Sequence, residues 1–222
     1  MIPPDVQLTR ELPYELDVRE IERLLGLPRG TSADARTAAT IEEARAFLAR
    51  RGGSWCRVRF LPGESPMREL RAALGTIVVA ASAGPALDAH VDTDWGAGRP
   101  DRAYAFDRVG AAIVEHLVVR AARDCATALL PHGLRITARS SPGCEGTSLD
   151  GQRRSFELLT APGEPPLPGP LRLFDSGMLA PRLSQIAVFA VDAGAGGGTL
   201  PEGATCVRCT YAPCSVRRRR TA

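Results

Sequence analysis

The sequence contains no lysine and no asparagine, so all 28 of its basic residues are arginine. A GC-rich genome produces this bias without selection on function, and the formal net charge is only +3. A nucleic-acid-binding surface needs basic residues gathered on one face. In the sequence, only residues 217–220 form a run of arginines. We therefore expect no nucleic-acid partner.

Long apolar runs and an export signal are lacking as well. The longest stretch without a charged residue, 72–87, has sixteen residues and is interrupted by two glycines and a proline. A membrane-spanning helix needs about 20 mainly apolar residues. The first ten residues do not combine a basic segment with an apolar one, as secretory signals do. These absences predict a cytoplasmic protein without a membrane partner.

The composition that remains is that of a globular protein. Apolar residues make up 44% and charged residues 24% of the 222 residues, which is enough chain for a sizeable core. Because no export signal is visible, the six cysteines are not expected to form disulfides. Cys56 and Cys125 lie in apolar segments and are predicted to be buried thiols. We expect one domain over residues 1–200 and a cysteine- and arginine-rich tail over residues 201–222.

The spacing of apolar residues predicts an α+β fold. Steps of three and four residues predict helices over 18–25, about 34–50 and 102–130. Alternating or continuous apolar runs predict strands over 56–61, 76–82, 134–139, 171–174 and 185–191, and short helices are predicted near 67–74 and 155–159. This order favours one mixed or antiparallel sheet packed against the long helix 102–130.

The loop after the strand over 134–139 is a candidate binding site. In that strand Ile136 and Ala138 alternate with Thr137 and Arg139, a pattern that delivers Arg139 into the loop. A glycine lets a backbone approach a ligand closely, and an arginine offers a forked donor for a carboxylate. The alternative is an ordinary turn whose arginine is solvated or paired on the surface. The candidate residues are Arg139, Ser140, Ser141, Pro142 and Gly143.

A second glycine-containing loop, between the strands over 171–174 and 185–191, contains Asp175, Ser176 and Met178. Asp175 could face a cation, and Met178 could pack against an adenine or a corrin ring. The alternative is a hairpin in which Asp175 and the glycine after Ser176 form the turn. The residues alone leave both interpretations open.

Three cysteines near the C-terminus, Cys206, Cys209 and Cys214, have the spacing of metal ligands. Thiolates two residues apart can chelate one metal ion or contribute to an iron–sulfur cluster. A closed site needs a fourth ligand, which Cys144 or His132 could supply only through folding. Disordered or redox-active thiols are the alternative. The sequence shows no catalytic triad, zinc-protease motif or phosphate-binding glycine loop.

Together these segments resemble the activation domain of vitamin B12-dependent methionine synthase, and more closely its small stand-alone relatives. The resemblance covers most of the chain and includes the helix-forming segment 17–26, the apolar strand that ends in Gly84 and Pro85, and the long helix after it. Residues 139–143 match the family's R-x-x-P-G-Y loop, and residues 175–178 resemble its acidic segment with a methionine. The cysteines of the tail, followed by arginines, resemble the tail of the stand-alone group.

The resemblance implies an S-adenosylmethionine-binding domain that helps to reactivate cobalamin. In the full synthase this domain presents S-adenosylmethionine to oxidised cobalamin, which takes an electron and then a methyl group. The family's arginine contacts S-adenosylmethionine, which implies this role for Arg139. This chain has no cobalamin, homocysteine or folate domain. We therefore expect an accessory protein of a separate corrinoid methyltransferase protein in methionine biosynthesis, rather than a complete enzyme.

The sequence departs from the family at one position, where Cys144 replaces the tyrosine that follows the glycine of the loop. Cys144 and the tail cysteines motivate an alternative function. In that alternative the chain is a non-catalytic scaffold or metal-binding module that keeps the fold and does not bind S-adenosylmethionine.

Overall fold

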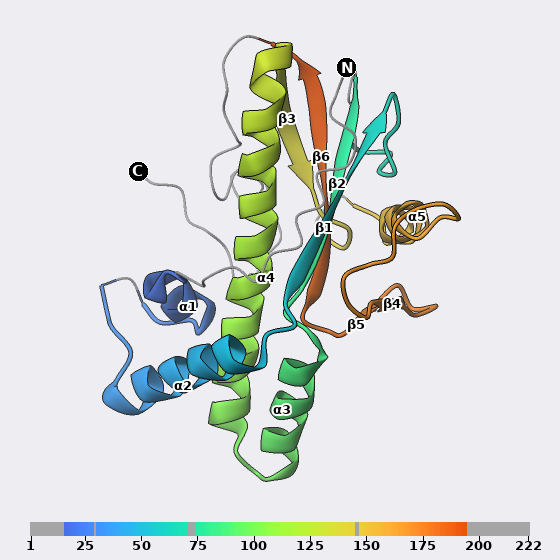
Figure 1. The fold of residues 1–222 in the computed structure, drawn as a ribbon. Helices are drawn as coiled ribbons and strands as arrows, with labels where there is room; N and C mark the ends of the chain where they lie inside the picture. Colours follow the sequence, from blue (N-terminus) through green and yellow to red (C-terminus); the bar gives the residue numbers. More distant parts are fainter. Residues whose placement is uncertain (1–15, 29, 71–73, 145–146, 195–222) are drawn as a thin grey trace.

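The computed structural model describes residues 16–28, 30–70, 74–144 and 147–194 of the chain (Figure 1). It confirms the predicted α+β class, because an antiparallel sheet of four strands packs against one long helix. Within these residues, no helix is long and apolar enough to cross a membrane.

The sheet has the strand order β1-β2-β6-β3. Its strands are β1 (Trp55–Pro62), β2 (Gly75–Ser82), β6 (Ser184–Ala193) and β3 (Leu134–Ser140). The two central strands are rich in β-branched and small apolar residues, which suit a pleated surface buried on both sides. Strand β2 is buried along its whole length, and β6 is buried over residues 186–191. Structure must therefore cover both faces of the sheet.

Helix α4 (Pro100–Leu129) covers one face, with α1 (Val18–Leu24), α2 (Ala35–Arg51) and α3 (Pro85–Gly96) packed around it (Figure 1). The apolar stripe that predicts this helix is the stripe that faces the core. Its buried members include Phe106, Val109, Ile113, Leu117 and Ala121.

The other face is covered by α5 (Asp150–Leu159) and by a small hairpin of β4 (Arg172–Leu173) and β5 (Leu179–Ala180) (Figure 1). A second apolar core lies between these elements and the sheet, with Trp55, Val78, Leu159 and Val188 among its members. The alternation of apolar residues with arginine over 56–61 predicts a half-buried strand, but β1 is buried on both faces over most of its length. Arg57 of β1 is only 2% exposed, because the second layer covers the face on which it lies.

Two further segments differ from the sequence-based expectation. Helix α3 is not predicted, because the stretch 92–101, which includes its last turn, is polar and has three glycine or proline residues. The helix begins at Pro85, whose fixed φ suits a first helical turn. The short helix predicted near 67–74 is absent from the described part of that segment. There the N–H of Leu70 donates to the carbonyl oxygen of Met67 at 3.2 Å in a turn.

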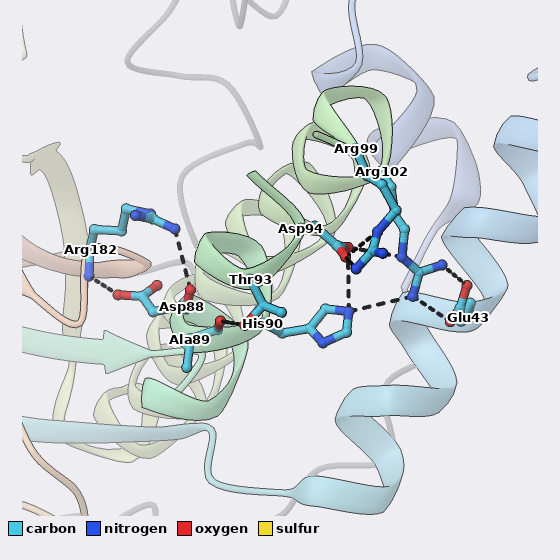
Figure 2. A network of polar contacts seen from close by, with 9 residues as sticks. All are labelled: Glu43, Asp88, Ala89, His90, Thr93, Asp94, Arg99, Arg102 and Arg182. Atoms are coloured by element: carbon cyan, nitrogen blue, oxygen red, sulfur yellow. Dashed lines mark hydrogen bonds and ion pairs between the residues drawn. The ribbon is translucent and has the colours of Figure 1, made fainter. Parts of the chain in front are cut away.

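Polar contacts at both ends of α3 hold it in place (Figure 2). Near the start of the helix, the carboxylate of Asp88 accepts the backbone N–H of Arg182 at 2.6 Å. The guanidinium of Arg182 donates to Asp92 at 2.8 Å. Near the end of the helix, the buried carboxylate of Asp94 pairs with Arg99 and Arg102. The two clusters fix α3 against the start of β6 and the start of α4.

Candidate functional site

A β-bulge near the end of β3 decides where Arg139 points. Ile136 and Ala138 pair with adjacent residues of β6, so Thr137 is an extra residue in the ladder. Beyond the bulge, Ala138 packs against the second core, and Arg139 lies on the same face of the sheet as Ile136, toward α4. The regular alternation expected from the sequence is therefore wrong beyond Ile136.

The guanidinium of Arg139 makes a two-pronged contact with a carboxylate of the long helix. Its Nη1 and Nη2 donate to Oε1 and Oε2 of Glu115, each at 2.7 Å. The guanidinium carbon also lies 5.8 Å from the ring centre of Phe189 in β6. The side chains of Arg139 and Glu115 are 15% and 26% exposed, so solvent reaches the pair. Arg139 is thus fixed by its ion pair with Glu115 and is still partly exposed, rather than fully solvated.

Sequence reasoning did not identify Glu115. It is 24 residues before Arg139 in the chain and follows the buried Val114 in the middle of α4. The one sequence feature that marks it is a carboxylate next to the apolar stripe of a core helix, a place where a charge needs a partner. Which partner it has depends on the bulge in β3.

The rest of the first candidate loop is held tightly at its start and turns sharply at its end. Ser140 and Ser141 are buried, and Nε2 of Gln185 contacts Oγ of Ser141 at 3.3 Å. The hydroxyl of Thr147 donates to the carbonyl oxygen of Ser141 at 3.0 Å. Gly143 has a φ of 79°, in the region that favours glycine. The glycine of this loop is therefore required by the backbone conformation.

The second candidate loop is the turn of a hairpin, but its second strand is β5, which is not predicted, rather than the strand predicted over 185–191. The N–H of Phe174 donates to the carbonyl oxygen of Met178 at 2.9 Å, and Asp175 and Ser176 occupy the exposed turn. Two side chains of α5 support the turn. Gln152 donates to the carbonyl oxygen of Gly177, and Arg153 donates to that of Asp175 at 3.1 Å. The hydrogen bond from Arg153 is to the backbone of Asp175, and within the residues that the structure describes the Asp175 side chain has no hydrogen bond or ion pair.

The structure brings the two candidate loops together at Leu149, next to the start of α5. A Cβ atom at Gly143 would lie 3.4 Å from one methyl group of Leu149, and a Cβ atom at Gly177 would lie 3.1 Å from the other. Leu149, Phe174 and Met178 are all exposed large apolar residues. Arg139 is not part of this junction, because its side chain points to the opposite face of the sheet.

The predicted thiol chemistry is only partly within the described chain. Cys56 and Cys125 are only 6% and 4% exposed, which confirms them as buried thiols, and this burial raises their pKa values to about 11 and about 12. Cys144 is exposed in the first candidate loop. Cys206, Cys209 and Cys214 lie outside the described residues. Across the described ranges, no group of three histidine, cysteine or acidic side chains is arranged to hold a metal ion.

Comparison with known proteins gives a similarity in structure only. No protein-family model matches the chain, and no curated protein matches it. Among solved structures, the chain resembles the crystal structure of the MetH reactivation domain bound to AdoHcy, with a TM-score of 0.47 and 13% sequence identity. The match covers 70% of this chain and 64% of that one, which is less than two thirds of its length.

Proposed function

We propose that this chain binds S-adenosylmethionine and presents it to a corrinoid cofactor carried by a separate protein, and so supports reductive methylation of that corrinoid. The observation that carries the proposal is the accessible Arg139–Glu115 pair. It stands at the end of β3, next to a loop that resembles an S-adenosylmethionine-binding loop in sequence.

The charges of the pair match those of an amino acid. The methionyl part of S-adenosylmethionine has one carboxylate and one ammonium group. Arg139 offers a planar fork for a carboxylate, and Glu115 offers acceptors for an ammonium group. Each side chain would exchange its present partner, held at 2.7 Å, for a ligand group of the same charge. The exchange leaves no buried charge without a counter-charge, which would otherwise be costly.

The proposed methyl transfer requires little general acid or base catalysis from this chain. A separate electron donor would reduce the corrinoid that a partner protein brings, and the reduced corrinoid would then take the methyl group of S-adenosylmethionine and leave S-adenosylhomocysteine. The residues of this chain hold the ligand and set the direction of its methyl group. Bulges commonly re-aim side chains next to active sites, and the bulge at Thr137 supports such a role because it turns Arg139 toward Glu115.

The alternative function is a scaffold or metal-binding module that keeps the fold without the ligand. Two observations favour it. Arg139 already has a complete bidentate partner, and Cys144 stands where the resembling family has tyrosine. In this alternative the Arg139–Glu115 pair is a structural link between β3 and α4.

Calorimetric titration with S-adenosylmethionine distinguishes the two functions. We expect Arg139→Ala to weaken binding by about 2–4 kcal/mol, roughly 30- to 1000-fold, because hydrogen bonds to charged groups are strong. Arg139→Lys should restore only part of the affinity, since an ammonium group cannot form the fork. Arg154→Ala, which removes an exposed arginine of α5, is the control and should bind like the wild type. Equal binding by Arg139→Ala and wild type would favour the alternative.

A second experiment tests the corrinoid partner. The wild type is mixed with a cob(II)alamin-loaded corrinoid protein, an electron donor and methyl-labelled S-adenosylmethionine. We expect label to reach the corrinoid, and less label to reach it with Arg139→Ala. Tight binding of S-adenosylmethionine without any transfer of label to the corrinoid protein would support the proposed ligand and contradict the proposed corrinoid partner.

A further inference from the structure

The outer face of β1 carries a row of hydrogen-bond donors that the proposed function does not use. Trp55, Arg57 and Arg59 alternate along this edge strand and share the face that is turned away from α4. The segment over residues 160–171, between α5 and β4, lies on the same side of the sheet (Figure 1) and contains five prolines. We call this segment the proline-rich loop.

One carboxylate of the proline-rich loop reaches both arginines. Oε2 of Glu164 accepts from Nη2 of Arg57 at 3.3 Å, and Oε1 forms an ion pair with Nη2 of Arg59 at 2.9 Å. Two guanidinium groups thus share a single carboxylate, and both of its oxygens are engaged. Arg57 is 3% exposed in its side chain, so most of this contact lies away from water.

The row has more buried donors than acceptors. Nε of Arg57 and Nε1 of Trp55 are both buried and have no hydrogen-bond partner among the residues that the structure describes. The backbone of Gly169 in the proline-rich loop lies against the indole, since a Cβ atom there would be 2.5 Å from Nε1. A buried donor that is left without an acceptor destabilises the fold, because it has lost its hydrogen bond to water. Folds rarely leave two such donors side by side in one row without a use for them.

We propose that Arg57 and Arg59 form a binding site for a phosphate group beside Trp55, and that the Glu164 carboxylate occupies this site in the structure and can be displaced from it. A carboxylate has two oxygens and satisfies two donors of the row. A tetrahedral phosphate group has more oxygens and a larger charge, so it can accept from both guanidinium groups and from the donors that Glu164 leaves over. The ligand is either inorganic phosphate or a small phosphorylated molecule.

The site is independent of the proposed S-adenosylmethionine site. Arg139 and Glu115 lie on the α4 side of the sheet, and this row lies on the other side. Glu164 is 17% exposed, so solvent and ions reach the carboxylate that a phosphate group would displace. Leu167 packs against the second core and holds the loop while Glu164 leaves. Because Glu164 competes for the same donors, removing its charge should tighten the binding of phosphate.

The test is calorimetric titration of the full chain with inorganic phosphate and, separately, with methyl phosphate. We expect Glu164→Gln to bind phosphate at least tenfold more tightly than the wild type. Glu157→Gln, which removes an exposed carboxylate of α5, is the matched control and should bind like the wild type. Arg59→Gln should reverse the gain of Glu164→Gln at least tenfold, and this variant spares the more deeply buried Arg57.

A second readout locates the bound ion. In a Trp95→Phe background, the single remaining indole N–H resonance belongs to Trp55, and phosphate should shift it in Glu164→Gln. Methyl phosphate that binds as well as phosphate identifies a phosphorylated small molecule as the ligand class, and weaker binding identifies the free ion. No tightening in Glu164→Gln, or tightening without a shift of the indole resonance, would overturn the proposal and leave Glu164 as a permanent structural link.

Discussion

Replacing Asp94 with asparagine should destabilise the protein through the loss of one buried negative charge. Asp94 is 0% exposed and lies in the last turn of α3. Its Oδ1 accepts from Nη2 and Nε of Arg99 at 2.6 and 2.9 Å, and its Oδ2 accepts from Nε of Arg102 at 2.8 Å (Figure 2). Nε2 of His90 lies 3.5 Å from the same Oδ2. Asparagine keeps one acceptor and leaves two guanidinium groups without this counter-charge.

The expected loss follows from the burial of each partner. Removing one member of a fully buried ion pair costs about 3–5 kcal/mol. Here Arg99 is 53% exposed and Arg102 is 27% exposed, so water screens part of the charge. Arg102 also keeps its contact with Glu43. We therefore expect Asp94→Asn to lower the free energy of unfolding by about 2–3 kcal/mol.

Urea unfolding at pH 7, followed by circular dichroism, measures this loss. Glu43→Gln is the matched control, because it removes a half-exposed carboxylate from the same network and should cost less than about 1 kcal/mol. A loss below 1 kcal/mol for Asp94→Asn, or equal losses for the two variants, would refute the argument from burial.

The ionisation of Asp94 should also make the free energy of unfolding depend on pH. Burial opposes ionisation of Asp94, but the hydrogen bond from Arg99 and the charges of Arg102, His90 and Arg99 outweigh it and lower its pKa below 3.8. A group with a lowered pKa stabilises the fold fully above its unfolded-state pKa, and this stabilisation is lost as the pH falls toward the folded-state pKa. The difference in unfolding free energy between wild type and Asp94→Asn should therefore shrink below about pH 4. A difference that is constant from pH 7 to pH 3 would contradict this.

Two further predictions concern the core around α4. Gly110→Ala should lower the free energy of unfolding by about 1–2 kcal/mol, because the new Cβ would lie 2.5 Å from the methyl groups of two buried leucines. Urea unfolding measures this loss, and a variant more stable than the wild type would contradict the prediction. Cys56 and Cys125 should resist iodoacetamide at pH 8 in the native protein, since their raised pKa values keep them protonated, whereas Cys144 should be alkylated. Mass spectrometry of the digested protein measures this, and equal labelling of Cys144 and Cys125 would contradict it.

The sequence predicts the elements whose apolar periodicity is long. Helix α4 has apolar residues at helical spacing over many turns, and β2 is a continuous apolar run, so both are identified as buried elements from the sequence. Helix α3 was missed because it buries only Leu87, Val91 and Asp94, and one of these is a charged residue whose partners come from other segments. A periodicity argument cannot detect a helix that is held by ion pairs.

Only the backbone conformation of the two candidate loops can be predicted from the sequence. The glycine of the first loop and the hairpin of the second follow from local turn chemistry, which short sequences encode. The direction of the Arg139 side chain does not follow from local turn chemistry, because one bulged residue, Thr137, turns every later side chain of β3 to the other face. The partner Glu115 is set by the packing of α4 on the sheet, which no local pattern specifies.

The most direct test of the central claim is a calorimetric titration of the wild-type chain with S-adenosylmethionine in the presence of two competitors. S-adenosylhomocysteine has the same carboxylate and ammonium groups, and 5′-methylthioadenosine has neither. If the Arg139–Glu115 pair receives the amino-acid part of the ligand, S-adenosylmethionine binds with a stoichiometry of about one. S-adenosylhomocysteine then competes with it and 5′-methylthioadenosine does not. No binding heat, or equal competition by both compounds, would contradict the account.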